Sequence, residues 1–328
     1  MEIESRDGGS SVGVIVGVVV GVIVFCGIVI FIIIYFIILP NNKNKNDDDI
    51  SKKDSVEMNG LEVFNEIGHG STSVVYKGRY NGKDVAVKIM RQDGGSGGVF
   101  SREIELMMKL KNPFIIEVYD KCVLSGHEGY VMEYVGMGSL CDVIQRQVMS
   151  DGLKMRYVRE ICLGMRYLQS MNIIHRDLKL ENILVLSVSE SDTRDAICKI
   201  SDFGTARETD ISNTLSMTMS MTMTNNIGTP LYMAPEILSG QSHYSQKADI
   251  YSYGIVLCGI WNQQIPYSDE SFENVTEFLT QVVNQEHRPS LKPDCPQPYT
   301  QLVAACLQSD PHSRPSFDEI SKAVFGVN

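Results

Sequence analysis

The chain contains 328 residues, of which 43% are hydrophobic and 21% charged, and its formal net charge is −11 at pH 7. This composition is typical of folded protein and excludes an intrinsically disordered chain. The acidic balance argues against a nucleic-acid-binding protein, because such proteins use a basic stripe to neutralise phosphates. At about 100 to 200 residues per domain, the length leaves room for two domains or for one domain with two lobes.

The hydrophobic residues are concentrated in one early segment. Residues 12–39 form a run of 28 positions without a charged side chain. A helix of this length measures roughly 42 Å, whereas the hydrocarbon core of a bilayer is about 30 Å thick. A cleaved signal peptide is the alternative, but its apolar part is about 7 to 15 residues long and follows a basic region, whereas acidic residues outnumber Arg6 here. The run therefore predicts one transmembrane helix.

The charges and glycines around this run indicate its orientation and a candidate contact face. Four lysines follow the run, so the bias of positive charge toward the cytosol places residues 1–11 outside and the body of the chain in the cytosol. Residues 40–60 are expected to form a polar linker. Glycine at every fourth position would let two helices approach closely as a homodimer; the alternative is that glycine is simply common in membrane helices. The lysines are Lys43, Lys45, Lys52 and Lys53, and the glycines are Gly9, Gly13, Gly17 and Gly21.

The cysteines are widely separated and include no Cys-x-x-Cys pair. This spacing argues against a zinc site and against a disulfide scaffold, and it fits a reducing compartment. They are Cys26, Cys122, Cys141, Cys162, Cys198, Cys258, Cys295 and Cys306.

Three runs typical of β-strands open the soluble part, at residues 61–68, 73–80 and 84–90, with a turn signal at Asn81-Gly82. Between the first two runs lies a Gly-x-Gly sequence, which lets the backbone approach a phosphate but on its own is more often a turn. Alternation along the third run places Ala86 and Lys88 on one face. That face offers a small residue beneath a flat ring and an ammonium for a phosphate, although a lone strand lysine is usually solvated.

Three motifs follow in a fixed order: HRDLKLEN at 175–182, DFG at 202–204 and APE at 234–236. In this order and spacing the chain resembles the eukaryotic protein kinases over residues 61–325. The resemblance implies an α+β, bilobal protein-kinase fold. The expected parts are a β-rich N-lobe with one helix at 61–132, a hinge at 133–138, and a larger, mainly helical C-lobe at 139–325.

The resemblance implies that Lys88 contacts the α- and β-phosphates of ATP and is held by a glutamate of the following helix. Glu103 is favoured for this role if the apolar positions of the helix face the core. Glu105, on another face, is the alternative. The apolar positions are Ile104, Met107 and Met108.

The remaining catalytic roles follow from the same resemblance. Asp177 is expected to accept or orient the proton of the substrate hydroxyl, and Lys179 to lie near the transferring phosphoryl group. Asn182 and Asp202 supply hard oxygen ligands for Mg²⁺, for which Mn²⁺ can substitute. Singly, each of these residues would be read as a turn Asn or Asp.

The adenine site is expected near residues 130–136, with Met132 at the gatekeeper position and backbone groups near Glu133 and Val135 hydrogen-bonding adenine. Apolar side chains would enclose the ring from both faces, although each would otherwise be read as ordinary core. The residues expected to bind ATP are Ile67, Gly68, His69, Gly70, Ser71, Val75, Ala86, Lys88, Met132, Glu133, Val135 and Leu184.

Lys179 and Thr229 match serine/threonine kinases, and the sequence around Thr229 most resembles that of the tyrosine-kinase-like group. The APE segment and Asp249 argue for protein substrates over small molecules or lipids. A catalytically inactive pseudokinase scaffold at the membrane is the competing reading. The four intact positions that oppose it are Lys88, Asp177, Asn182 and Asp202.

Several structural positions are also expected from the resemblance. Asp249 should brace the catalytic loop, and Arg314 should pair with Glu236. Two departures are Ser73, which replaces the third glycine of the phosphate loop, and a polar insertion at 187–195. Neither removes a phosphate-, metal- or proton-handling group.

The activation segment at 202–236 is rich in serine and threonine. A phosphate there would carry about −1.5 to −2 charge and would suit Arg176 beside Asp177, so phosphorylation of this segment is a candidate regulatory step. The alternative is a disordered insertion. The candidate acceptors are Thr209, Ser212, Thr214, Ser216, Thr218, Ser220, Thr222 and Thr224.

Overall fold

The computed structural model describes residues 58–70, 73–91, 104–202, 207–208, 229–240 and 245–327. Outside these ranges lie the expected membrane run at 12–39, the four spaced glycines, most of the activation segment, and the single residues Ser71 and Glu103. No helix within the described ranges is both long and apolar enough to cross a membrane. Seven cysteines fall inside the described ranges, and all seven are free.

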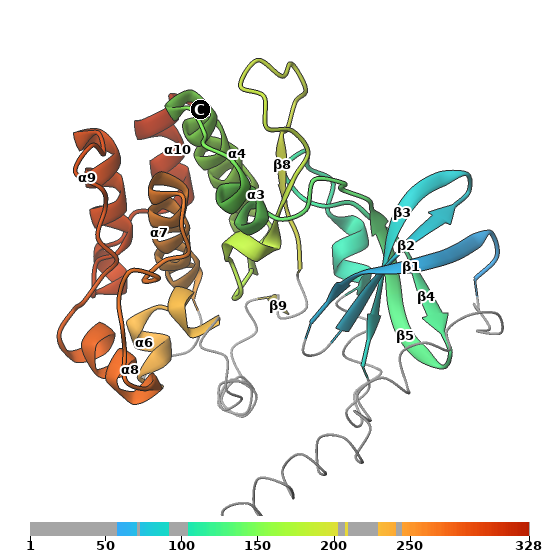
Figure 1. Cartoon of the computed structure of the whole chain (residues 1–328), viewed down its shortest axis with the longest axis horizontal. Helices are drawn as coiled ribbons and strands as arrows, with labels where there is room; N and C mark the ends of the chain where they lie inside the picture. The colour runs from blue at the N-terminus through green and yellow to red at the C-terminus, as the bar shows by residue number, and fades with distance from the viewer. Residues whose placement is uncertain are drawn as a thin grey trace, which may run out of the picture. The chain divides into compact units, whose positions relative to one another are not determined.

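The N-terminal part of the described chain is a five-stranded antiparallel sheet with the strand order β1-β2-β3-β5-β4 (Figure 1). The three strands expected from sequence are present, and β2 and β3 pair from Ser73↔Met90 to Tyr80↔Lys83. Asn81 and Gly82 connect them with φ values of +50° and +80°, the combination that a tight hairpin turn requires. The strands are β1 (Leu61–His69), β2 (Ser73–Tyr80), β3 (Lys83–Met90), β4 (Val118–Leu124) and β5 (His127–Glu133).

A helical segment at 104–109 follows β3. Its side chains Ile104 and Met107 are each 2% exposed and belong to the main hydrophobic core, and Met108 packs against that core. The expected apolar face is therefore confirmed. Glu105 points elsewhere and pairs with Lys121 of β4 at 2.6 Å.

The C-terminal part is mainly helical. Helix α4 packs against α7 and α10, and α7 packs against α9 (Figure 1). Helix α7 is buried nearly all round. Helix α4 is capped at its N-terminus by Ser150, whose hydroxyl accepts from the N–H of Leu153. The helices are α3 (Leu140–Arg146), α4 (Asp151–Ser170), α6 (Pro235–Leu238), α7 (Gln246–Asn262), α8 (Val275–Asn284), α9 (Gln297–Cys306) and α10 (Phe317–Phe325), with 3-10 turns at Leu180–Asn182, Thr229–Tyr232 and Pro311–Ser313.

Two short pairs of strands begin next to the segment 175–182, one directly before it and the other directly after it. Strands β6 (Ile173–Ile174) and β9 (Arg207–Glu208) form one pair, and β7 (Ile183–Val185) and β8 (Cys198–Ile200) form the other. The β7–β8 hairpin places the end of the HRDLKLEN motif beside the start of the DFG motif, because Asn182 precedes β7 and Asp202 follows β8.

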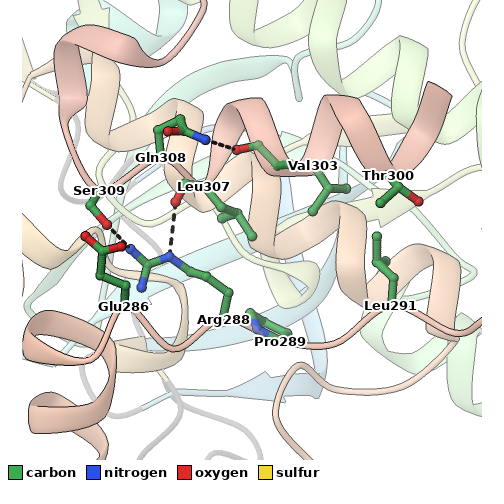
Figure 2. A pocket seen from close by; sticks show the side chains of 10 residues that line it. Glu286, Arg288, Pro289, Leu291, Thr300, Val303, Leu307, Gln308 and Ser309 are labelled. Carbon is green, nitrogen blue, oxygen red and sulfur yellow. Dashed lines mark hydrogen bonds between the residues drawn. The ribbon is translucent and has the colours of Figure 1, made fainter. Parts of the chain in front are cut away.

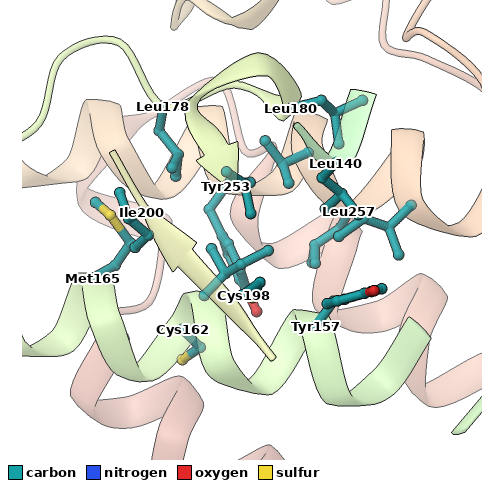
Figure 3. Close-up of a cluster of buried hydrophobic side chains, with 14 of the residues drawn as sticks. Leu140, Tyr157, Cys162, Met165, Leu178, Leu180, Cys198, Ile200, Tyr253 and Leu257 are labelled. Carbon is teal, nitrogen blue, oxygen red and sulfur yellow. The ribbon is translucent and has the colours of Figure 1, made fainter. Parts of the chain in front are cut away.

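The hydrophobic core continues directly beneath this motif. Leu178 and Leu180 are fully buried and lie in one cluster with Tyr157 of α4 and Tyr253 and Leu257 of α7 (Figure 3). Two apolar anchors within a polar loop fix where its other side chains emerge. The sheet-rich smaller part and the helical larger part agree with the α+β, bilobal fold expected from sequence.

Candidate active site

The backbone of the catalytic loop is held by a buried carboxylate. Asp249 of α7 is 3% exposed and accepts hydrogen bonds from the N–H groups of His175 at 2.8 Å and Arg176 at 2.9 Å. Arg176 has a φ of +70°, a conformation that costs an ordinary residue about 1 kcal/mol or more. The two bonds from Asp249 hold the chain in this conformation, and they confirm the bracing role expected of Asp249.

His175 joins the catalytic loop to the segment that precedes Asp202. Its ring is fully buried, with Nδ1 accepting from the N–H of Asp177 at 3.3 Å and Nε2 lying 3.1 Å from the carbonyl oxygen of Ser201. The two contacts fit a single neutral tautomer, with the proton on Nε2. One imidazole thereby fixes the spacing of the two motifs.

The carboxylate of Asp177 lies between an ammonium and an amide. Lys179 Nζ is 2.7 Å from Asp177 Oδ2, and Asn182 Nδ2 donates to the same oxygen at 2.9 Å and to the carbonyl of Asp177 at 2.7 Å. Both charged side chains are 18% exposed. The arrangement orients the carboxylate while leaving it accessible.

Lys88 of β3 pairs with Asp202, with 2.5 Å between Nζ and Oδ1. Burial on its own would raise the pKa of the Asp202 carboxyl, but the Lys88 ammonium overcomes this effect and holds that pKa below its usual range. Burial likewise opposes the charged form of Lys88, and nearby Tyr130 and Asp202 outweigh it, so the pKa of Lys88 is raised. Both groups are therefore charged at neutral pH.

The residue before Asp202 is bonded to the other expected metal ligand, Asn182. The N–H and the hydroxyl of Ser201 both donate to the carbonyl of Asn182, at 2.8 and 3.0 Å, and Asp202 itself has a φ of +63°. An amide oxygen and a carboxylate suit a hard divalent cation. Within the described ranges no group of three or more His, Cys, Asp and Glu side chains is placed to hold a metal ion.

The apolar residues expected around adenine lie on β2, β3, β5 and β7 and just after β5. Ala86 of β3 faces Met132 of β5 in the sheet register, and both are buried together with Val135. Val75 and Leu184 are partly buried and pack against the same core. These apolar side chains would form the two faces of a flat-ring site.

The hydrogen bonds of the hinge limit which backbone group of Glu133 can bind adenine. The N–H of Glu133 donates to the carbonyl of Glu117 at 2.9 Å, so the backbone group that Glu133 can offer to adenine is its carbonyl. Its carboxylate pairs with Lys199 of β8 at 2.6 Å, with side chains 22% and 15% exposed. Sequence reasoning missed this link because no pattern connects two residues so far apart in the chain.

The phosphate loop is described as far as Gly70. Gly68 lies opposite Val75 in the β1–β2 register, and the N–H of Gly70 donates to the carbonyl of Ser73 at 2.8 Å. Ile67 is 43% exposed, and His69 Nδ1 lies 3.1 Å from Glu66 Oε1. The two glycines thus stand at the turn from β1 into β2, where the sequence placed them.

The segment after the activation loop is anchored by an ion pair. Arg314 is 1% exposed, and its two terminal nitrogens donate to the carboxylate oxygens of Glu236 at 2.7 and 2.8 Å. This two-bond geometry is the strong form of an arginine–carboxylate contact. The pairing expected from sequence is confirmed.

A separate cavity of about 480 Å³ lies in the helical part, between residues 286–291 and α9. Arg288 lines it, and its guanidinium donates to the carbonyl of Leu307 at 3.1 Å and to the hydroxyl of Ser309 at 3.0 Å (Figure 2). The guanidinium also donates to the carbonyls of Val282 and His287. The guanidinium of Arg288 is thus taken up by bonds within the protein, and none of the residues expected to bind ATP lines this cavity.

Comparison with known proteins agrees with the geometry. The sequence profile of the protein kinase domain matches residues 61–325. Three Dictyostelium discoideum proteins are similar: an RGS domain-containing serine/threonine-protein kinase A (33% identity, 83% of this chain, 23% of the relative), a probable LIM domain-containing serine/threonine-protein kinase (33%, 83% and 40%), and the dual specificity protein kinase pyk3 (31%, 82% and 19%). The chain thus spans less than half the length of each relative. With this profile match and these assembled motifs, the chain belongs to the protein kinase family.

Proposed function

We propose that this chain is a membrane-anchored protein kinase that transfers the γ-phosphoryl group of ATP to serine and threonine hydroxyls of proteins. The observation that carries the proposal is the assembly of the catalytic loop with β3 and the DFG segment. Lys179 and Asn182 orient the carboxylate of Asp177. Lys88 of β3 forms an ion pair with Asp202, which follows β8. Phosphoryl transfer depends chiefly on such positioning and on charge neutralisation.

Each residue has a part in the proposed reaction. Asp177 takes or orients the proton of the acceptor hydroxyl, and its accessible carboxylate suits that task. Lys179 supplies positive charge beside the γ-phosphoryl group, and Lys88 neutralises charge on the α- and β-phosphates. Magnesium bound with ATP, or manganese in its place, supplies neutralisation of the phosphate charge, and Asn182 and Asp202 are the residues that would hold it.

The acceptor class is proposed from Lys179 and Thr229, which match serine/threonine kinases, within the tyrosine-kinase-like group. The names of two similar proteins give the same class, whereas pyk3 is named a dual specificity kinase. Tyrosine acceptors are therefore the alternative to test. Protein rather than lipid substrates are supported by the buried pairing of Arg314 with Glu236, which anchors the APE segment.

The membrane attachment is proposed from the run at 12–39 alone. With lysines after the run, the kinase domain faces the cytosol and residues 1–11 lie outside. A homodimer through the glycine face is proposed from the four-residue spacing of its glycines. A dimer would raise the effective concentration of one kinase domain for the other.

Regulation by phosphorylation is proposed for the serine- and threonine-rich activation segment. Arg176 adjoins Asp177, so a phosphate that pairs with it would bias the conformation of the catalytic loop. Mass spectrometry of the active protein tests this step. We expect phosphate between Thr209 and Thr224, and its absence from fully active protein would contradict the proposal.

A pseudokinase scaffold is the second candidate function. It would be favoured by a missing phosphate-, proton- or metal-handling group, and the described residues retain Lys88, Asp177, Asn182 and Asp202. Nucleotide binding without transfer is the outcome that would support it.

The experiment is transfer from γ-labelled ATP to a generic protein acceptor, with phosphoamino-acid analysis of the product. We expect label on serine and threonine, in the presence of Mg²⁺ or Mn²⁺ and not in the presence of a chelator. Label on tyrosine as well would assign dual specificity. No label with any acceptor would contradict the proposed activity.

A further inference from the structure

The polar insertion between β7 and β8 is held by one face of helix α4, a feature that the proposed chemistry does not require. The loop that precedes β8 extends past that strand in Figure 1. At its start, the buried hydroxyl of Tyr157 donates to the carbonyl of Ser187 at 2.6 Å. Further along, the guanidinium of Arg156 donates to the carbonyls of Arg194 at 2.8 Å and Asp192. One side chain thus satisfies two backbone acceptors of the loop.

A buried carboxylate holds the other end of the insertion. Glu160 is 2% exposed, and its Oε2 accepts from the N–H groups of Ile197 at 2.7 Å and Cys198 at 3.0 Å. Its Oε1 accepts from Nε of Arg156 at 2.9 Å. A buried carboxylate is tolerated only when it is paired and hydrogen-bonded, and here both oxygens are engaged. Arg156 and Glu160 therefore act as one unit, which we call the α4 clamp.

The insertion also docks on the first turn of the same helix. The carboxylate of Glu190 accepts from the hydroxyl of Ser150, the residue that caps α4, and the N-terminal end of a helix favours negative charge. It lies above Gly152, where an added Cβ would be 1.9 Å from Glu190 Oε1. A side chain at position 152 would therefore displace the carboxylate of Glu190 from its place over the first turn of α4.

The clamp is connected to the two proposed metal ligands through strand β8. Cys198, which Glu160 holds, begins the strand that leads to Asp202, and the carbonyl of Asn182 accepts from the N–H of Ser201 at 2.8 Å. The hairpin is closed by three pairs of residues and by N–H groups of Leu186 and Ser187 that donate to the carbonyl of Ile197. The clamp adds a link from β8 to α4, through the N–H groups of Ile197 and Cys198. A shift of the hairpin would therefore reach both ligands.

We infer that Arg156 and Glu160 are positioning residues that fix Asn182 and Asp202 for the metal–nucleotide complex through the β7–β8 hairpin. The inference rests on the proposed function of these two ligands. Groups hydrogen-bonded directly to metal ligands typically change metal affinity or activity by about 10- to 100-fold, and the clamp, which acts through the hairpin, belongs at the lower end of this range. We expect the effect to be larger with the metal than without it, because the hairpin connects the two proposed metal ligands. Leu184 on the same hairpin and Lys88, which pairs with Asp202, act with or without the metal.

The test compares Arg156→Ala with Arg159→Ala in the full chain. Arg159 lies on the same helix and is exposed, so it is the matched control. The measurements are the dissociation constant of a fluorescent ATP analogue with Mg²⁺ and with EDTA, and amide hydrogen exchange. Glu160→Gln is a second variant that keeps an acceptor oxygen for the two N–H groups but loses the charge facing Arg156.

For Arg156→Ala we expect faster exchange in residues 186–200 and binding about tenfold weaker with Mg²⁺, with a clearly smaller loss of binding in EDTA. Glu160→Gln should show the same selective loss to a smaller degree. Equal weakening with and without Mg²⁺, or binding identical to that of Arg159→Ala, would overturn the inference. Wild-type protein that binds no nucleotide would instead overturn the proposed function.

Discussion

At the residue scale, the site depends on one local group of polar and charged side chains and on one ion pair that joins distant parts of the sequence. Asp177 with Lys179 and Asn182 is a local group, and the HRDLKLEN spacing predicts it. Lys88 with Asp202 is not local, because the two residues are 114 positions apart. Sequence reasoning assigned Glu103 as the partner of Lys88, a residue outside the described ranges. The motif order placed Lys88 and Asp202 in one site, but which carboxylate meets the ammonium depends on how β3 stands relative to β8.

The Lys88–Asp202 pair predicts a particular dependence of stability on pH. The folded-state pKa of Asp202 lies below its usual range, so its stabilising contribution is present above the unfolded pKa of about 3.9 and is lost as the pH falls through the folded value. Lys88 stays charged throughout, because its pKa is raised. We expect Lys88→Met to lower the free energy of unfolding at pH 7, and the difference from wild type to shrink below about pH 4.

Urea unfolding at several pH values between 3 and 7 measures this difference. Lys121→Met is the control, because Lys121 forms a more exposed pair with Glu105 and should show a smaller effect. A difference between wild type and Lys88→Met that stays constant down to pH 3 would show that the pair is not the cause.

At the element scale, the short and irregular pieces carry the site, and they are the least predictable part of the fold. The strands at 61–68, 73–80 and 84–90 were predicted within one residue at either end, since alternation and the Asn81-Gly82 turn are local signals. The β6–β9 pair joins residues far apart in sequence, and its two-residue strands form only because tertiary packing aligns them. The α4 clamp was equally invisible, because an arginine and a glutamate four positions apart usually mark an exposed helix face.

The pairing of Arg314 with Glu236 should be a large element-scale contribution to stability. Arg314→Met leaves the carboxylate of Glu236 and several carbonyls without their donor in a buried place. We expect a loss of about 3 to 5 kcal/mol in the free energy of unfolding. Arg166→Met removes the more exposed contact with Asp318 at 3.0 Å and should cost less than about 1 kcal/mol.

Denaturant unfolding of both variants gives the comparison directly. Similar losses for Arg314→Met and Arg166→Met would mean that the buried pair contributes no more than a surface contact, contrary to its burial and its two-bond geometry.

At the scale of the whole molecule, the uneven hydrophobicity of the sequence separates the chain into a proposed membrane anchor and a kinase domain. The motifs predicted the α+β fold of the domain and the approximate position of its hinge, because each motif occupies a fixed place in the family. The motifs carry no information on the first 60 residues, for which hydrophobicity and charge are the only guides. The anchor therefore needs its own test.

The anchor predicts that the chain sediments with membranes and resists extraction at alkaline pH, whereas a chain beginning at residue 41 is released. A tag at the C-terminus should be digested by protease added to the cytosolic side of sealed membranes. Protection of that tag would reverse the orientation, and release of the full chain at alkaline pH would contradict the transmembrane helix.

The central claim is that Asp177 handles the proton in phosphoryl transfer, and the most direct measurement is the rate of transfer from γ-labelled ATP at saturating nucleotide. Asp177→Asn keeps the shape of the side chain but lacks the carboxylate, while Asp195→Asn changes an exposed carboxylate of the insertion. We predict that Asp177→Asn binds nucleotide like wild type and transfers phosphate about 10² to 10⁴ times more slowly, with Asp195→Asn unaffected. Transfer by Asp177→Asn at the wild-type rate would contradict the account.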